Sequence, residues 1–139
     1  MHTAKLDEQE LIRHALDARE RAYAPYSRFQ VGCALLDDQG QIHYGCNVEN
    51  AAYGPTNCAE RTALFSAIAA GRKPGAFAAI AIVADLPDPV TPCGVCRQVM
   101  SELCPPDLPV ICANLSGEIK RYTVAELLPG AFSLRRKNS

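Results

Sequence analysis

Three cysteines and one glutamate in this chain have the spacing of a metal site that performs chemistry. Cys93 and Cys96 stand three residues apart, so at the first turn of a helix both sulfurs project to the same side and can hold one ion. Cys58 must reach that ion from another part of the chain. Three thiolates leave a tetrahedral zinc ion one open position, where water is activated as a nucleophile. The pattern therefore predicts a catalytic zinc site and hydrolytic chemistry.

The neighbours of Cys58 supply no fourth thiolate or imidazole. Asn57, Ala59 and Arg61 cannot provide either group, and the remaining neighbour is Glu60. On its own, Glu60 would be an ordinary acidic residue in the first turn of a helix, where it is stabilising. Beside an activated water, a carboxylate that is not a ligand can take the proton of that water and pass it to the leaving group. We therefore interpret Glu60 as the general acid and base.

The charge of such a site must be offset. Three thiolates on a divalent ion leave a net negative charge, which raises the pKa of an activated water and opposes its ionisation. Most arginines on a helix are surface charges, but Arg61 stands close enough to Cys58 in sequence to offset the negative charge of the thiolates. We expect Arg61, or the backbone N–H groups at the helix starts, to provide the compensating positive charge.

Length, composition and charge exclude several classes of protein. The 139 residues fit one domain, predicted to span residues 1–139, and 48% hydrophobic with 21% charged residues is typical of globular proteins. The net charge of −1, with a basic cluster only at residues 135–137, disfavours nucleic-acid partners. No signal peptide and no apolar run of membrane-spanning length is visible. We therefore expect a cytoplasmic protein without a membrane partner.

Cysteine usage agrees with a reducing compartment. Seven cysteines are an odd number in a chain without an export signal, which favours free thiols over a disulfide framework. Cys33, Cys104 and Cys112 lie in apolar segments and are interpreted as small buried residues. Cys46 stands at the end of a predicted strand, where packing is favoured over metal ligation.

Apolar periodicity and turn residues divide the chain into alternating elements. These are a helix over residues 8–23, strands over 29–36 and 41–46, a helix over 58–70, a strand over 77–83, a helix over 93–103, strands over 108–113 and 119–122, and a short helix over 124–128. Thr123 and Glu126 have the spacing of a capping box for the last helix. The order predicts an α/β fold, with a mixed five-stranded sheet in a three-layer α/β/α arrangement. Both halves of the metal motif then fall at helix starts.

Five motifs distributed over nearly the whole chain match one known family. They are Ala24-Pro25-Tyr26-Ser27-Arg28-Phe29, Gly45-Cys46-Asn47-Val48-Glu49-Asn50-Ala51, Cys58-Ala59-Glu60-Arg61-Thr62-Ala63, Pro92-Cys93-Gly94-Val95-Cys96-Arg97-Gln98 and Leu127-Leu128-Pro129. Through these motifs the chain closely resembles the small homotetrameric cytidine deaminases of nucleoside salvage. The resemblance implies that an activated water attacks C4 of cytosine, while Glu60 moves protons to ring N3 and to the departing amine. The products are then uridine and ammonia, with zinc as the cofactor.

The resemblance also implies which residues bind a nucleoside. Asn47 and Glu49 match residues that hold a ribose hydroxyl, and side chains two apart on an extended segment point the same way. Taken without the resemblance, both would be polar turn residues. The carboxylate of Glu49 would repel a phosphate, and residues 47–57 contain no Lys or Arg, so free nucleosides are expected over nucleotides.

Four further positions are assigned by the resemblance alone. Phe29 matches an aromatic residue that packs against the nucleoside, and the backbone of Ala59 is expected to donate to the base. Tyr53 matches a loop residue that lines the site, and Phe132 matches an aromatic residue that reaches the base-binding pocket of a neighbouring subunit. These assignments imply a homotetramer with sites shared between subunits.

Three other functions compete with this interpretation. A deaminase of another aminopyrimidine, such as an aminoglycosyl-cytosine antibiotic, would carry the same metal motif. A non-enzymatic zinc module would need a fourth protein ligand, which the spacing does not supply. Nucleic-acid editing is opposed by the near-neutral charge and by the absence of an aromatic and basic stripe in the sequence.

Overall fold

One mixed sheet organises the computed structural model of this chain, which describes residues 7–134. The strands are β1 (Val31–Asp37), β2 (Ile42–Cys46), β3 (Phe77–Ala84), β4 (Pro109–Asn114) and β5 (Ile119–Thr123). Their order across the sheet is β2-β1-β3-β4-β5. β3 and β4 run parallel, and the other neighbouring strands are antiparallel. Within the described residues, the predicted five-stranded mixed sheet is therefore confirmed.

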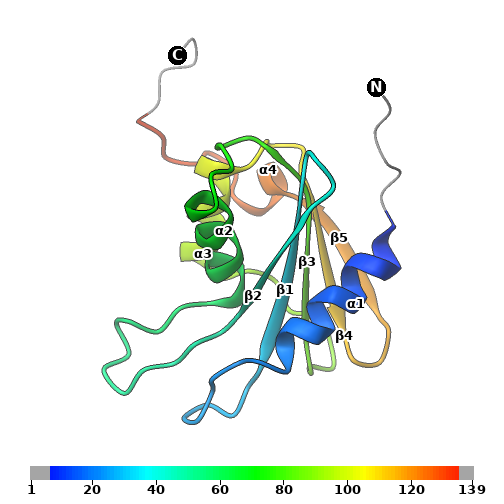
Figure 1. Cartoon of the computed structure of the whole chain (residues 1–139), viewed down its shortest axis with the longest axis vertical. Helices are drawn as coiled ribbons and strands as arrows, with labels where there is room; N and C mark the ends of the chain where they lie inside the picture. The colour runs from blue at the N-terminus through cyan, green and yellow to red at the C-terminus, as the bar shows by residue number, and fades with distance from the viewer. Residues whose placement is uncertain (1–6, 135–139) are drawn as a thin grey trace.

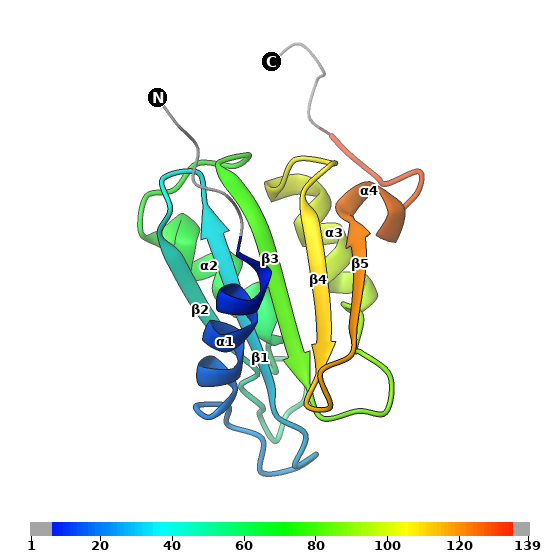
Figure 2. The ribbon, with the colours of Figure 1, turned by 90° about the vertical axis from the view of Figure 1, so that its right-hand side faces the viewer.

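Helices cover both faces of this sheet. α1 (Glu8–Arg19) lies across one face, and α2 (Ala59–Ala69) and α3 (Gly94–Leu103) lie on the other (Figures 1 and 2). The short α4 (Val124–Leu127) follows β5 directly and begins with the predicted capping box between Thr123 and Glu126. The predicted three-layer arrangement is confirmed.

Alternation along the strands builds two separate apolar clusters, because successive side chains point to opposite faces of a sheet. Cys33, Ile82 and Cys112 stand opposite one another on β1, β3 and β4 and face α2 and α3. Their sequence neighbours pack against α1 instead, among them Ala34 and Ile111. Cys33, Cys104 and Cys112 are all buried, as the apolar surroundings predicted.

The first helix is shorter than predicted. It ends at Arg19, because the chain leaves the helix to pair with the segment after β2. The N–H of Tyr23 donates to the carbonyl oxygen of Asn47 at 2.9 Å, and the carbonyl oxygen of Tyr23 accepts from the N–H of Glu49 at 2.8 Å. A helical Tyr23 could not make this bridge, so the prediction of helix over residues 20–23 was wrong.

The first strand also begins later than predicted. Phe29 lies before β1, in a segment where the preceding Arg28 has a φ of 57°. This is the left-handed region, which a residue with a Cβ adopts at a cost. The side chain of Asn47, not a neighbouring strand, bonds the carbonyl oxygen of Phe29 and the N–H of Val31. The prediction of a strand from residue 29 was therefore wrong by two residues.

Among residues 7–134, the structure contains no helix both long and apolar enough to span a membrane.

Candidate metal centre and active site

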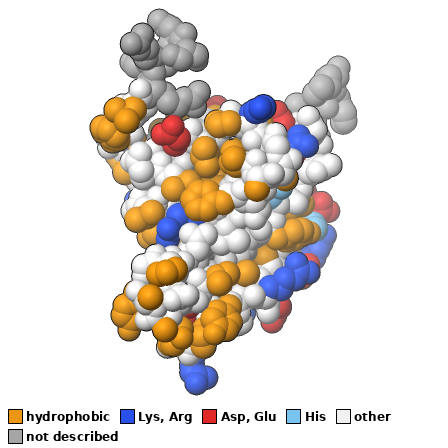
Figure 3. Space-filling view, turned by 60° about the vertical axis from the view of Figure 1, so that its left-hand side comes forward, with side chains coloured by type: hydrophobic (Ala, Val, Ile, Leu, Met, Phe, Trp, Pro, Cys, Tyr) orange, Lys and Arg blue, Asp and Glu red, His pale blue; other side chains and the backbone are white. Residues whose placement is uncertain are grey.

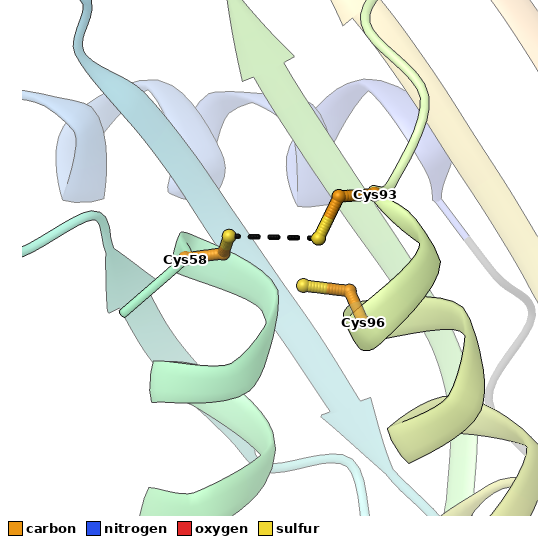
Figure 4. A group of neighbouring side chains, drawn as sticks. All are labelled: Cys58, Cys93 and Cys96. Atoms are coloured by element: carbon orange, nitrogen blue, oxygen red, sulfur yellow. Dashed lines mark hydrogen bonds between the residues drawn. The ribbon is translucent and has the colours of Figure 1, made fainter. Parts of the chain in front are cut away.

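Two helix starts bring the three cysteines together. Cys58 is the N-cap residue of α2 and Cys93 that of α3, and neither side chain caps its own helix. Cys96 lies in the first turn of α3. The three sulfur atoms turn toward one another (Figure 4) and all lie within 4.8 Å. The Sγ atoms of Cys58 and Cys93 are 3.8 Å apart.

This cluster fits zinc. A Zn–S bond of about 2.3 Å in tetrahedral geometry requires sulfur atoms about 3.8 Å apart, which is the separation of Cys58 and Cys93. Among residues 7–134, no other His, Cys, Asp or Glu joins the group. Three thiolate ligands without a fourth protein ligand match a catalytic zinc site rather than a structural one.

The surroundings favour a thiolate at Cys58. Hydrogen bonds with Cys96, Arg61 and Cys93 lower the pKa of Cys58 to about 5, against the opposing effect of burial. The Nη2 atom of Arg61 donates to the Sγ of Cys58 at 3.1 Å. The hydrogen bond with Cys58 and burial raise the pKa of Cys96. Binding of a divalent ion displaces such a retained thiol proton.

Glu60 lies in the first turn of α2 and is only 5% exposed. Burial is the main cause that raises the pKa of Glu60 to about 7. A backbone hydrogen bond, Arg61 and Cys96 oppose this shift in pKa, and the negative charge of Cys58 adds to it. A buried carboxyl group beside the ligands, with its pKa shifted upward, has the protonation behaviour that a general acid and base requires.

Gly45 sets the height of α2 above the sheet. A Cβ atom at this position of β2 would lie 2.1 Å from the carbonyl oxygen of Ala59 and 2.6 Å from the backbone nitrogen of Ala63. The first turn of α2, which carries Glu60, therefore rests directly on the strand. Sequence reasoning did not assign this residue, although a glycine inside a strand is a known signal of close backbone approach.

Asn47 fixes the chain at the start of β1. Its Oδ1 accepts from the N–H of Val31 at 2.8 Å, and its Nδ2 donates to the carbonyl oxygen of Phe29 at 2.7 Å. Phe29 itself is half-buried. The side-chain amide thus holds the segment that presents Phe29.

Glu49 holds the neighbouring turn. Its Oε1 accepts from the N–H groups of Tyr26 at 2.9 Å and Ser27 at 3.1 Å, and its Oε2 accepts from the hydroxyl of Ser27. The Ser27 hydroxyl is the main cause that lowers the pKa of Glu49. Asn47 and Glu49 therefore face the same segment, residues 26–31, as their spacing predicted.

Val48, between these two residues, ties them to the metal site. It forms a parallel bridge with Tyr23 and an antiparallel bridge with Asn57. The latter has hydrogen bonds of 3.0 and 2.9 Å between the two backbones. Because Asn57 directly precedes Cys58, the predicted ribose-binding residues and the first metal ligand share one hydrogen-bonded framework.

The remaining predicted residues divide into one at the cluster and two at the surface. Ala59 is the first residue of α2, where backbone N–H groups have no partner within the helix. Tyr53 is 79% exposed and has a left-handed φ of 64°, and Phe132 is 67% exposed. Within residues 7–134 of one chain, neither aromatic ring is buried against the cysteines. Both rings would need contacts with another chain or with a ligand to form part of a substrate site.

Comparisons with known proteins agree with this geometry. The family model described as the cytidine and deoxycytidylate deaminase zinc-binding region matches residues 5–112. The chain is 59% identical over 133 residues to a cytidine deaminase of Halalkalibacterium halodurans, covering 96% of this chain and 99% of the relative. It is 55% identical to one of Sporosarcina psychrophila, covering 92% and 93%. The crystal structure of cytidine deaminase from Burkholderia pseudomallei superposes with a TM-score of 0.90 at 55% identity, covering 91% of this chain and 100% of that one.

Proposed function

This chain belongs to the cytidine deaminase family, and from this premise we propose that it hydrolyses cytidine, and also deoxycytidine, to the uracil nucleoside and ammonia. The observation that carries the proposal is the buried Glu60 beside a three-cysteine cluster with no fourth ligand among the described residues. Cys58, Cys93 and Cys96 would hold the zinc. When bound there, zinc supplies Lewis-acid activation of a water molecule.

Glu60 performs the proton transfers in this proposal. It accepts a proton from the attacking water, whose oxygen forms the new bond to C4 of the cytosine ring. It delivers this proton to ring N3. It then takes the remaining proton of the new C4 hydroxyl and passes it to the amino nitrogen, so that the C4–N bond breaks, the C4 carbonyl forms and ammonia leaves. Arg61, which donates to Cys58 at 3.1 Å, offsets part of the negative charge of the three thiolates.

The substrate is held by residues around this centre. We assign Asn47 and Glu49 to a ribose hydroxyl, Phe29 to the face of the nucleoside and the N–H of Ala59 to the base. Tyr53 and Phe132 complete the site through subunit contacts. The support is the framework of residues 26–31 and 47–57, in which Asn47 and Glu49 lie on one side and Asn57 leads into Cys58.

Ammonia release tests the reaction and its substrate class together. We expect the zinc-loaded protein to release ammonia from cytidine with a kcat/KM at least about fivefold higher than from cytidine monophosphate. The reason is that the charge of Glu49 opposes a phosphate by at least about 1 kcal/mol at close range. The Glu49→Gln variant removes this charge, so the ratio of kcat/KM for cytidine to kcat/KM for cytidine monophosphate should fall. No release of ammonia from cytidine would refute the proposed function. An equal kcat/KM for the two substrates would refute only the role of Glu49 in excluding phosphate.

The same proposal includes the assembly and setting of the protein. We infer a single domain that forms a homotetramer and acts in pyrimidine salvage in the cytoplasm. Apolar side chains reach the surface on the side that carries α2 and α3 (Figure 3). Exposed members of these helices include Phe65 and Val95, the latter 58% exposed. Exposed apolar surface of this kind favours association.

Light scattering during turnover tests the shared site. We expect the active species to have four times the mass of one chain, and the Phe132→Ala variant to raise KM for cytidine. A monomer with full activity would contradict the tetramer and would remove both Phe132 and Tyr53 from the neighbouring subunit's site.

A further inference from the structure

Arg97 uses its whole guanidinium group to fix the backbone around the metal-binding helix. Its Nε donates to the carbonyl oxygen of Pro92 at 2.7 Å and its Nη2 to the hydroxyl of Thr91 at 3.2 Å. Both partners lie in the loop that directly precedes Cys93. Its Nη1 donates to the carbonyl oxygen of Leu127 at 2.9 Å, at the end of α4. One side chain thus joins α3, the metal loop and the C-terminal part of the chain.

Gln98 makes a second link from the same helix. Its Nε2 donates to the carbonyl oxygen of Phe132 at 3.1 Å. Residues 128–132 contain no helix or strand, and the hydrogen bonds of Arg97 and Gln98 hold this segment at both of its ends. The residues that follow Cys96 in sequence therefore connect the ligands to the segment that presents Phe132.

The chemistry of these contacts suits positioning rather than catalysis. A guanidinium group is planar and offers five donors in a fixed fork, so three acceptors bound at once are held at fixed relative positions. A lysine ammonium keeps the charge but cannot reproduce that fork. Groups that orient metal ligands from outside the first coordination sphere change metal affinity or activity by about 10- to 100-fold when removed.

We propose that Arg97 and Gln98 are positioning residues that lock the Cys93 loop and the segment 128–132 to α3 as one unit. Arg97 acts on the zinc site through Pro92 and Thr91, and on the substrate site through Leu127. Gln98 acts on the substrate site through Phe132. The part that concerns Phe132 rests on the proposed function, whereas the part that concerns the metal loop depends only on zinc binding.

Zinc transfer and kinetics separate these roles. The zinc-loaded wild type, Arg97→Lys, Gln98→Leu and Thr91→Val are mixed with a colorimetric chelator, and KM and kcat for cytidine are measured in parallel. Arg97→Lys should lose zinc about tenfold faster and also raise KM, because both of its links are weakened. Gln98→Leu should raise KM about fivefold and leave the zinc transfer rate unchanged. Glu102→Gln, at an exposed position of α3, is the matched control.

Distinct results would overturn the two halves of this proposal. An unchanged zinc transfer rate in Arg97→Lys refutes the role of Arg97 at the metal loop. If Arg97→Lys does not fold, the zinc transfer rate of Thr91→Val decides the same point, because this variant removes only the hydroxyl contact with Arg97. A faster rate supports the role of Arg97 at the metal loop, and an unchanged rate refutes it. An unchanged KM in Gln98→Leu, in a wild type that releases ammonia, refutes the link to Phe132. A wild type that releases no ammonia refutes the proposed function, while zinc transfer still tests Arg97.

Discussion

Replacing Glu60 with glutamine is expected to reduce turnover of cytidine by about 10²- to 10⁴-fold while zinc stays bound, because proton transfer by a positioned side chain contributes that much to a rate. Glutamine has nearly the same size and can occupy the same buried position in the first turn of α2. It cannot take a proton from water. The measurement is ammonia release from cytidine at several protein concentrations, with the zinc content of each preparation determined in parallel.

Two outcomes of this experiment would contradict the assignment of Glu60 as the general acid and base. Turnover close to that of the wild type would show that another group moves the protons. Loss of zinc together with turnover would show that Glu60 supports the metal site rather than the reaction. Glu102→Gln is the matched control, because it makes the same chemical change at an exposed position of α3.

Replacing Gly45 with alanine is expected to destabilise the protein by about 3 kcal/mol or more. The added Cβ would lie 2.1 Å from the carbonyl oxygen of Ala59, so either β2 or the first turn of α2 must move. Overpacking a core side chain alone costs about 1–3 kcal/mol, and here the obstacle is backbone that cannot rotate away. Urea unfolding of the zinc-loaded protein measures the loss, and zinc content shows whether Cys58 has moved with its helix.

The control for this substitution is Gly54→Ala. Beyond the residues adjacent to it in the chain, the nearest atom to its Cβ would be the carbonyl oxygen of Ala52 at 4.0 Å, and the φ of Gly54 is not positive. We expect little change in the urea midpoint. If Gly45→Ala unfolds at the same urea concentration as the wild type and keeps its zinc, the close approach of α2 to β2 does not determine the geometry of the site.

Elements defined by their own side chains were predictable from the sequence, and those defined by distant backbone partners were not. Apolar periodicity and turn residues placed the strands and helices to within a few residues. The end of α1 depends on Tyr23 pairing with Asn47 and Glu49, which lie more than twenty positions away. Phe29 was placed in a strand because it is apolar, but the side chain of Asn47 bonds its carbonyl oxygen and the N–H of Val31, so β1 begins only at Val31.

The site follows the same division. Cys93 and Cys96 are three apart on one helix, so their convergence is a local property of the chain. Cys58 could be grouped with them only through the metal hypothesis, and the structure does bring the three sulfur atoms together. Glu60 would be an ordinary acidic residue on its own, and only its place beside the ligands predicted its proposed role. Arg97 belonged to a motif of the resemblance without a role of its own, since two of its three acceptors are backbone carbonyl groups, which no residue type reveals. Only the folded chain shows which carbonyl groups face it.

The backbone bridge between Val48 and Asn57 also bears on how this protein can vary. Because hydrogen bonds of 3.0 and 2.9 Å close the base of the loop, residues 50–56 project from a fixed stem. Lengthening such a loop costs mainly chain-closure entropy, about 0.6 kcal/mol for each doubling. Insertions at the tip therefore cost little free energy and leave Cys58 in place, whereas a single insertion within the stem would shift Asn47 and Glu49, the proposed ribose-binding residues, out of register together with Cys58. A change of length within residues 50–56 therefore spares the metal ligand, but it displaces Tyr53 and so alters the part of the proposed site that this loop supplies.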